Sequence, residues 1–399
     1  MEPNWNNFET PERVGDGQKH IMRIEVLIAS IGIALLPRFA QAQADCGLPG
    51  DAGDHWPLAA LESVSLDGAT LCPVVNWLAG THANVHAVLV ARQGKLVFEQ
   101  YFSGLDERWG QPVGEIAFGP QIKHDERSVT KSVVGLLVGI AIDRGLIKDV
   151  DAPVLSFFPE YPDLRSTERY RITLRHLLTM SAGLEWHELD TPYTSEANSE
   201  NRMDNAIDRY RFVLEQKVVA PPGQNWNYSS GSSELLGAVL KRATGEGLDE
   251  LARKSLFEPL GISDVEWHKY PQGDPIAAGG LRLRPRDLAK IGQLVLQRGA
   301  WNGVQIVPAA WVDAATSLQI NVPGSPSYGY QFWLDRQLVG SSEVHWAVGI
   351  GLGGQRLFIT PDLGLVVVVN AGLYKSDQQG SVPRVILNRY VLKAIGPHP

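Results

Sequence analysis

A serine and a lysine three residues apart stand at the start of an apolar run. Ser128 and Lys131 precede residues 133–142, which are all aliphatic or glycine. On a helix, residues i and i+3 share a face roughly 5–6 Å apart, so the lysine amine can reach the serine hydroxyl. Burial favours the neutral amine, which can accept the serine proton. The pair predicts a nucleophile and its base; the alternative is a capping serine beside a lysine that reaches solvent.

A tyrosine and two serines form a second candidate group. Tyr228, Ser229 and Ser230 follow a Pro-Pro-Gly turn and lead into a helical pattern. A tyrosine beside a Ser/Lys pair can carry a proton between the nucleophile and a leaving group. Ser230 is expected to hydrogen-bond either a substrate or Lys131. The alternative is a packed tyrosine followed by a helix-capping serine.

Glycines at 349, 351, 353 and 354 form the third group, at the entry to a strand. Without side chains they allow the backbone to approach a ligand closely. A backbone N–H in this stretch, with that of Ser128, would make an oxyanion hole. Glycines that only serve a bulge or a tight strand entry are the alternative reading.

The elements that must position these residues follow a simple order along the chain. A hairpin around Gln93-Gly94 precedes helical patterns, and strands with a turn at Pro361-Asp362 return before a terminal helix. The expected segments are a hairpin at 87–102, helices at 132–145, 173–184, 232–245 and 382–395, and strands at 328–335 and 355–370.

Sheet-forming segments thus bracket a helical insert. We expect an α/β domain made of residues 85–126 and 275–399, a helical domain over 127–274, and an N-terminal segment over 45–84. The polar stretch 185–210 is either a lid or rim loop or a solvated connection.

Composition and motifs argue against several classes of function. The chain carries 44 acidic and 36 basic side chains without a basic block, so nucleic acid is not an expected partner. His82 and His86 lack the companions of a metal site, and no G-x-S-x-G elbow or phosphate-binding loop is present. We therefore expect no metal and no cofactor.

The first 44 residues have the parts of a secretory signal. Lys19, His20 and Arg23 precede an apolar run at 26–36, which is followed by small residues. We expect an N-terminal extension, a signal peptide over about 22–44 and cleavage near Ala42 or Ala44. An ordinary buried helix is the alternative. The run is too short to span a bilayer, so we expect a secreted or periplasmic protein without a stable membrane anchor.

The two cysteines of the chain, Cys46 and Cys72, lie just after this segment. An oxidising compartment would let them form a disulfide. Two free structural thiols are the alternative if the protein is not exported.

Taken together and in this order, the motifs at 128–131, 172–184, 221–230, 279–296 and 351–355 resemble those of serine hydrolases of the class C β-lactamase and penicillin-binding-protein superfamily. The "YSS" and "GGQ" forms are most similar to 6-aminohexanoate-dimer hydrolases and related esterases. The resemblance covers about residues 85–395. It implies an antiparallel sheet flanked by helices with an inserted all-helical subdomain, and a site in the crevice between them.

The resemblance also implies roles for single residues. Ser128 would be the acylated nucleophile, Lys131 its activator and Tyr228 the proton shuttle. The backbone N–H groups of Ser128 and Leu352 would form the oxyanion hole. The expected substrate-binding residues are Ser230, Gly351 and Gly353.

Two departures from the β-lactamase pattern bear on the substrate. Tyr228-Ser229-Ser230 stands where β-lactamases carry Y-x-N, and Gly349-Ile350-Gly351 stands where they carry K-T-G. The missing lysine removes the cation that would hold a β-lactam carboxylate. We therefore expect a small-molecule ester or linear amide as substrate. The alternatives are a β-lactamase or D-alanyl-D-alanine carboxypeptidase, and a non-enzymatic binding or sensor protein.

Overall fold

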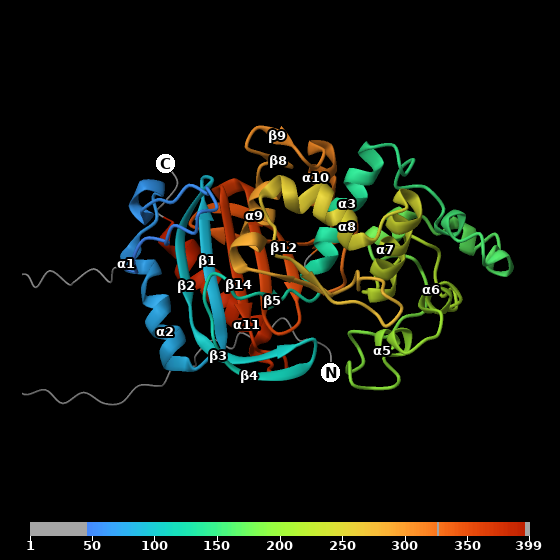
Figure 1. The fold of residues 1–399 in the computed structure, drawn as a ribbon, viewed down its shortest axis with the longest axis horizontal. Helices are drawn as coiled ribbons and strands as arrows, with labels where there is room; N and C mark the ends of the chain where they lie inside the picture. Colours follow the sequence, from blue (N-terminus) through green and yellow to red (C-terminus); the bar gives the residue numbers. More distant parts are fainter. Residues whose placement is uncertain (1–45, 325–326, 396–399) are drawn as a thin grey trace, which may run out of the picture.

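The computed structural model describes residues 46–324 and 327–395 (Figure 1). The expected signal peptide lies outside the described residues. One antiparallel sheet of seven strands organises the fold, in the order β10-β11-β12-β13-β14-β1-β2. Its strands are β1 (Val85–Arg92), β2 (Lys95–Tyr101), β10 (Ser327–Tyr328), β11 (Trp333–Val339), β12 (Ser342–Gly351), β13 (Gln355–Thr360) and β14 (Leu365–Ala371).

The sheet joins the two ends of the chain. β1 pairs with β14, and the hairpin expected at Gln93-Gly94 connects β1 to β2. Both turn residues have positive φ, 52° and 80°, as a tight hairpin turn requires. The expected α/β fold with an antiparallel sheet is confirmed.

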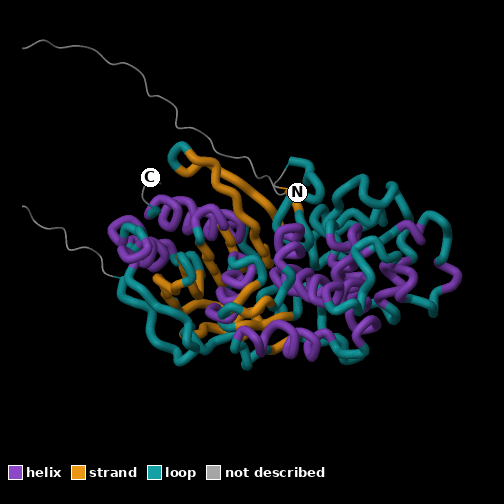
Figure 2. Tube along the Cα trace, turned by 90° about the horizontal axis from the view of Figure 1, so that it is seen from above, coloured by secondary structure: helices purple, strands orange, loops and turns teal. Residues whose placement is uncertain are grey.

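Helices cover both faces of the sheet (Figures 1 and 2). The valines of β14 show why: Val366 and Val368 pack into one apolar cluster and Val367 and Val369 into the other, because successive side chains alternate between faces. One face carries α3 (Val129–Asp143), α9 (Pro285–Leu296) and α10 (Ala309–Ala315). The other face carries α1 (Gly68–Leu71), α2 (Pro73–Thr81), α11 (Gln378–Val385) and α12 (Leu392–Ala394).

The middle of the chain is helical and lies beside the sheet on the α3 side (Figure 1). Its helices are α4 (Leu174–Leu178), α5 (Ser199–Asp204), α6 (Arg209–Leu214), α7 (Ser230–Thr244) and α8 (Leu248–Ala252). Small strands complete the fold: β3 (Ser103–Arg108), β4 (Gln111–Ala117), β5 (His124–Asp125), β6 (Glu266–Trp267), β7 (Leu281–Leu283), β8 (Ala300–Trp301) and β9 (Val304–Gln305).

The helix expected at 173–184 is shorter than its apolar pattern predicts. It ends at Leu178, and Met180 and Gly183 then adopt positive φ values of 57° and 74°. A Cβ at Gly183 would lie 2.2 Å from the Ala220 carbonyl oxygen, so the chain turns here to pack against another segment. Tertiary contact therefore outweighs local helical spacing at this point.

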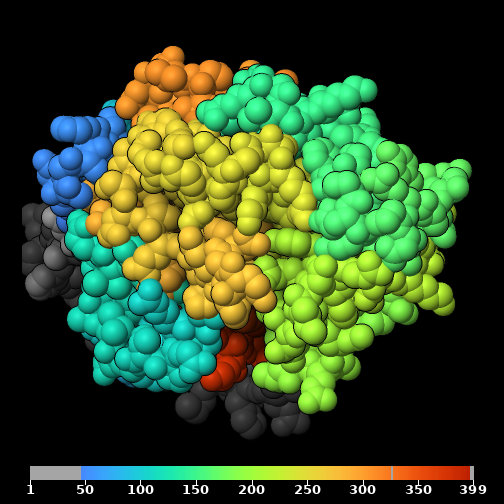
Figure 3. Space-filling model, turned by 45° about the vertical axis from the view of Figure 1, so that its right-hand side comes forward, coloured from blue at the N-terminus to red at the C-terminus, as the bar shows by residue number. Residues whose placement is uncertain are grey.

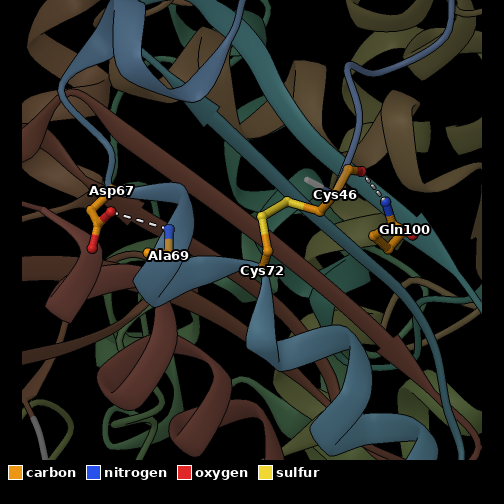
Figure 4. Close-up of a disulfide and its surroundings, with 5 residues drawn as sticks. All are labelled: Cys46, Asp67, Ala69, Cys72 and Gln100. Carbon is orange, nitrogen blue, oxygen red and sulfur yellow. Dashed lines mark hydrogen bonds between the residues drawn. A yellow bond between two sulfur atoms is a disulfide. The ribbon is translucent and has the colours of Figure 1, made fainter. Parts of the chain in front are cut away.

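A disulfide joins Cys46 to Cys72, as expected (Figure 4). Cys72 lies between α1 and α2, and Asp67 caps α1 by accepting a hydrogen bond from the Ala69 N–H. Gln100 of β2 donates to the Cys46 carbonyl oxygen at 2.8 Å. The N-terminal segment is thereby attached to the edge of the sheet.

Within the ranges 46–324 and 327–395, two further features are absent. None of the helices is long and apolar enough to cross a membrane. In the same ranges, no group of three or more His, Cys, Asp or Glu side chains could hold a metal ion.

Candidate active site

Ser128 and Lys131 lie where α3 begins, and Lys131 contacts Ser230 at the start of α7. Ser128 is the N-cap residue, but its side chain makes no capping hydrogen bond. Lys131 is 2% exposed, so its amine does not reach solvent. α3 is buried around nearly its whole circumference, as its uniformly apolar sequence predicts. The alternative of a capping serine beside a solvated lysine therefore does not describe this site.

Three oxygen atoms surround the Lys131 amine. Nζ lies 3.0 Å from Ser128 Oγ, 3.1 Å from Ser230 Oγ and 2.8 Å from the Ala278 carbonyl oxygen. The carbonyl can only accept a hydrogen bond. Ser230 donates its hydroxyl proton to Glu188, so it too must accept from Lys131. A neutral amine would use its two N–H groups on these acceptors and direct its lone pair at Ser128.

Burial lowers the pKa of Lys131, while nearby acidic side chains, Glu188 first among them, act in the opposite direction. The net shift is downward, which favours the neutral form that a base requires. Burial raises the pKa of Glu200 and of Glu234 to about 8. Near neutral pH these two carboxyl groups are therefore mostly protonated and contribute less negative charge beside Lys131.

Tyr228 lies against the same pair. Its ring centroid is 5.0 Å from Lys131 Nζ. Burial raises the pKa of Tyr228 well above its ordinary value, and a hydrogen bond with Ser128 acts in the opposite direction. The phenol therefore keeps its proton at neutral pH, and it is in contact with the serine hydroxyl. Trp226, Tyr328 and Trp333 pack around Tyr228, with Trp333 stacked at 5.9 Å.

Glu188 is the residue at this site that the sequence did not reveal. It is 2% exposed and lies beneath Ser230. Both the N–H and the hydroxyl of Ser230 donate to its carboxylate at 2.7 Å. Trp186 Nε1 donates at 2.7 Å and the Tyr193 hydroxyl at 3.2 Å. Four donors thus compensate a carboxylate that would otherwise be costly to bury.

The glycine turn, which consists of the end of β12 and the residues after it (349–354), approaches the segment around Ser128 from the sheet. A Cβ at Gly349 would lie 2.9 Å from Val129, and one at Gly351 would lie 2.4 Å from the Glu126 carbonyl oxygen. Side chains at these positions would collide with the segment that leads into α3. The close approach of strand and helix therefore requires glycine.

The backbone N–H groups near this contact differ in their partners. Gly353 donates its N–H to Gln379 Oε1 at 3.0 Å. In the part of the chain that the structure describes, the N–H groups of Ser128 and Leu352 have no acceptor. The N–H and the hydroxyl of Ser230 both donate to Glu188. Of the expected substrate-binding groups, Gly351 and Ser230 lie at the site, whereas the N–H of Gly353 is already occupied.

A hollow opens on the surface near the helical part. In Figure 3, red atoms from the C-terminal part of the chain lie at its floor, between teal atoms of residues just beyond 100 and yellow-green atoms of the middle of the chain. The segment 185–210, expected as a rim loop or a solvated connection, contributes α5 and the buried Glu188.

The fold and these motifs place the protein in a known family. The chain belongs to the Beta-lactamase family, whose model matches residues 78–387. This agrees with the resemblance that the ordered motifs indicate, and with the antiparallel sheet flanked by helices.

Particular relatives are hydrolases. The chain is 26% identical to the 6-aminohexanoate-dimer hydrolase of Paenarthrobacter ureafaciens over 71% of each chain. It is 31% identical to the esterase EstB of Burkholderia gladioli over 44% of this chain and 45% of that enzyme. A solved structure of a Bacillus anthracis protein, assigned as a 6-aminohexanoate-dimer hydrolase, superimposes with a TM-score of 0.65 at 23% identity, covering 81% of each chain.

Proposed function

We propose that the protein is a serine hydrolase that cleaves a carboxylic ester or a small linear amide through an acyl-enzyme on Ser128. The observation that carries the proposal is the placement of Lys131, a buried amine 3.0 Å from Ser128 Oγ whose other two contacts are both acceptors. An amine in this setting serves as a base toward the serine.

The reaction then proceeds in two steps. Lys131 takes the hydroxyl proton as Ser128 Oγ attacks the substrate carbonyl carbon. The free N–H groups of Ser128 and Leu352 receive the negative charge on the carbonyl oxygen. Tyr228 passes the proton to the leaving alcohol or amine as the bond to it breaks. Water attacks the acyl group in the second step, with its proton following the reverse route, and Ser128 is regenerated.

The substrate class follows from the missing cation. Gly349 occupies the strand position at which β-lactamases carry the lysine of K-T-G, so a β-lactam carboxylate has no ammonium partner there. The esterase and the amide hydrolase among the relatives support the preference for simple esters and linear amides.

Covalent labelling of Ser128 tests the proposal. Wild-type protein is expected to gain the mass of one fluorophosphonate adduct and to hydrolyse a nitrophenyl ester, whereas Ser128→Ala is expected to do neither. Ser132→Ala is a matched control, because Ser132 lies one turn further along α3 and donates to the Gln331 carbonyl instead. Ester hydrolysis that persists unchanged in Ser128→Ala would refute the role of Ser128 as nucleophile. Wild-type protein that neither hydrolyses the ester nor forms the adduct would refute the enzyme role and leave a binding or sensor protein.

A substrate comparison separates the alternatives within this chemistry. We expect nitrophenyl butyrate to be cleaved with a kcat/KM far above that for a chromogenic cephalosporin or a D-alanyl-D-alanine peptide. Comparable values for the cephalosporin would identify a β-lactamase, and a preference for the peptide would identify a carboxypeptidase.

We also propose that the protein is exported and that the residues up to Ala42 or Ala44 are removed. The Cys46–Cys72 disulfide supports this, since such bonds persist in oxidising compartments. Intact mass of protein recovered from a bacterial periplasm is expected to correspond to a chain that begins at Gln43 or Asp45. Recovery of the uncleaved chain in the cytoplasm would contradict export.

A further inference from the structure

A buried arginine lies directly behind the glycine turn. Arg356 is the second residue of β13 and is 5% exposed. Its Nη1 donates to the carbonyl oxygens of Gly351 at 3.1 Å and Gln355 at 2.8 Å. Its Nη2 donates to the Gln379 carbonyl oxygen at 3.0 Å. The guanidinium thus connects the end of β12, the start of β13 and α11.

This guanidinium has no counter-ion within the described ranges. Its hydrogen bonds go to backbone carbonyls, and the charged group that influences it most is another cation, Arg384. Burial first, and Arg384 second, lower the pKa of Arg356 to about 9. A buried charge without a partner is costly, and most are paired. The structure therefore buries the positive charge of Arg356 beside the Gly351 carbonyl without a carboxylate from the described residues to compensate it.

The hydrogen bond to Gly351 fixes the orientation of one peptide unit. In a trans peptide, the C=O of one residue and the N–H of the next point in opposite directions. With the Gly351 oxygen directed at Arg356, the Leu352 N–H points away from Arg356. Gly351 itself packs against Glu126, two residues before Ser128. The free N–H thus belongs to a peptide that is held by Arg356 through its oxygen and lies next to the segment leading into Ser128.

We propose that Arg356 is a positioning residue for the oxyanion hole: it holds the Gly351–Leu352 peptide in place and polarises it, so that the Leu352 N–H stabilises negative charge on the substrate oxygen. The inference rests on the proposed acyl-enzyme mechanism. A cation on the carbonyl side of a peptide withdraws electron density from it and makes its N–H a stronger donor. Arg356 acts through the peptide and does not touch the substrate.

Arg92 offers a matched control on the same sheet. It is also 5% exposed, and it also donates to a backbone carbonyl, that of Ser65 at 2.8 Å. It lies on β1 and contacts the N-terminal segment, so its hydrogen bond does not involve the glycine turn. Replacement of Arg92 measures the general cost of losing a buried guanidinium; replacement of Arg356 measures that cost plus any effect on the oxyanion.

The test compares Arg356→Met, Arg356→Lys and Arg92→Met with wild type, using nitrophenyl butyrate as substrate and phenylboronic acid as inhibitor. A boronate that binds a serine becomes tetrahedral and anionic, so its affinity reports on stabilisation of the oxyanion. Loss of one oxyanion-hole donor lowers kcat by roughly 10²–10³-fold, and loss of its support should cost less. We expect Arg356→Met to lower kcat by about 10- to 100-fold, to leave KM within about twofold, and to weaken the boronate by the same factor as kcat.

Arg356→Lys is expected to fall between wild type and Arg356→Met, because it keeps the charge but loses the forked geometry. Arg92→Met should keep kcat and boronate affinity. Equal effects of Arg356→Met and Arg92→Met, or an unchanged boronate affinity in Arg356→Met, would overturn the inference. If Arg356→Met does not fold, Arg356→Lys decides by the same two readouts. Failure of the acyl-enzyme itself is recognised separately, because wild type would then form no adduct on Ser128.

Discussion

Helices cover both faces of the seven-stranded sheet, but the two faces bury different kinds of side chain. The face toward α3 and the helical part encloses Lys131, Glu188 and Ser230 in one hydrogen-bonded group. The face toward α1, α2 and α11 packs against an apolar cluster that includes Cys72 of the disulfide. Because buried polar groups cost free energy unless they are compensated, their concentration on one face supports the proposal that the active site lies there.

Arg356 connects the two faces. It follows Gln355 and precedes Leu357, whose side chain packs on the α3 face, so Arg356 points to the α11 face. From there it reaches the glycine turn. The face that otherwise serves stability thus supplies one polar group to the site.

The largest effect is expected from removal of the base. Lys131→Ala should lower kcat for a nitrophenyl ester by about 10³-fold or more, because the nucleophile loses its proton acceptor. Circular dichroism and thermal unfolding should show that the fold is retained.

Lys290→Ala is the matched control for Lys131→Ala. Lys290 is likewise 2% exposed, but it lies on α9 and pairs with Asp54. Its replacement should lower stability and leave turnover near wild type. Near-normal turnover in Lys131→Ala would remove the role assigned to that residue.

A smaller effect is expected from Glu188→Gln. Glu188 raises the pKa of both Lys131 and Tyr228, so its loss should lower both values. The pH profile of kcat/KM should then move to lower pH, and kcat should fall about 10-fold because an amide cannot accept from both Ser230 donors.

Glu185→Gln provides the comparison, since Glu185 is exposed three residues earlier in the same segment. Its pH profile should coincide with that of wild type. A profile for Glu188→Gln that does not move would show that this carboxylate only anchors the loop.

The smallest effect on activity is expected on the opposite face. Replacement of both Cys46 and Cys72 by serine should lower the free energy of unfolding by about 3 kcal/mol, because the bond closes a loop between residues 26 apart. Neither kcat nor KM should change. Urea unfolding and steady-state kinetics of the same preparation measure both quantities, and a large loss of turnover in folded protein would contradict the division between the faces.

Local patterns predicted the fold, and they predicted that Ser128 and Lys131 lie in contact. The spacing of Ser128 and Lys131, the apolar run after them and the turn before Tyr228 are all features of neighbouring residues. Such features specify an element and the residues that share one of its faces. The family resemblance supplied the order in which the separate motifs combine.

Glu188 and Arg356 could not be predicted in this way. Glu188 lies in a polar segment without periodicity, and it is buried only because that segment folds over Ser230. Arg356 occupies a strand position that alternation assigns to the apolar α11 face. The role of each residue depends on partners that are distant in sequence, and local sequence patterns do not reveal such partners.

The pH dependence of phosphonylation tests the central claim most directly, because it follows the attack of Ser128 without a choice of substrate. In wild type, the rate constant for adduct formation should rise with pH and level off, with a midpoint below the ordinary lysine value of 10.5, as the buried Lys131 loses its proton. Lys131→Arg, which stays charged, should react at least about 10³-fold more slowly. A wild-type rate and profile in Lys131→Arg would contradict the account.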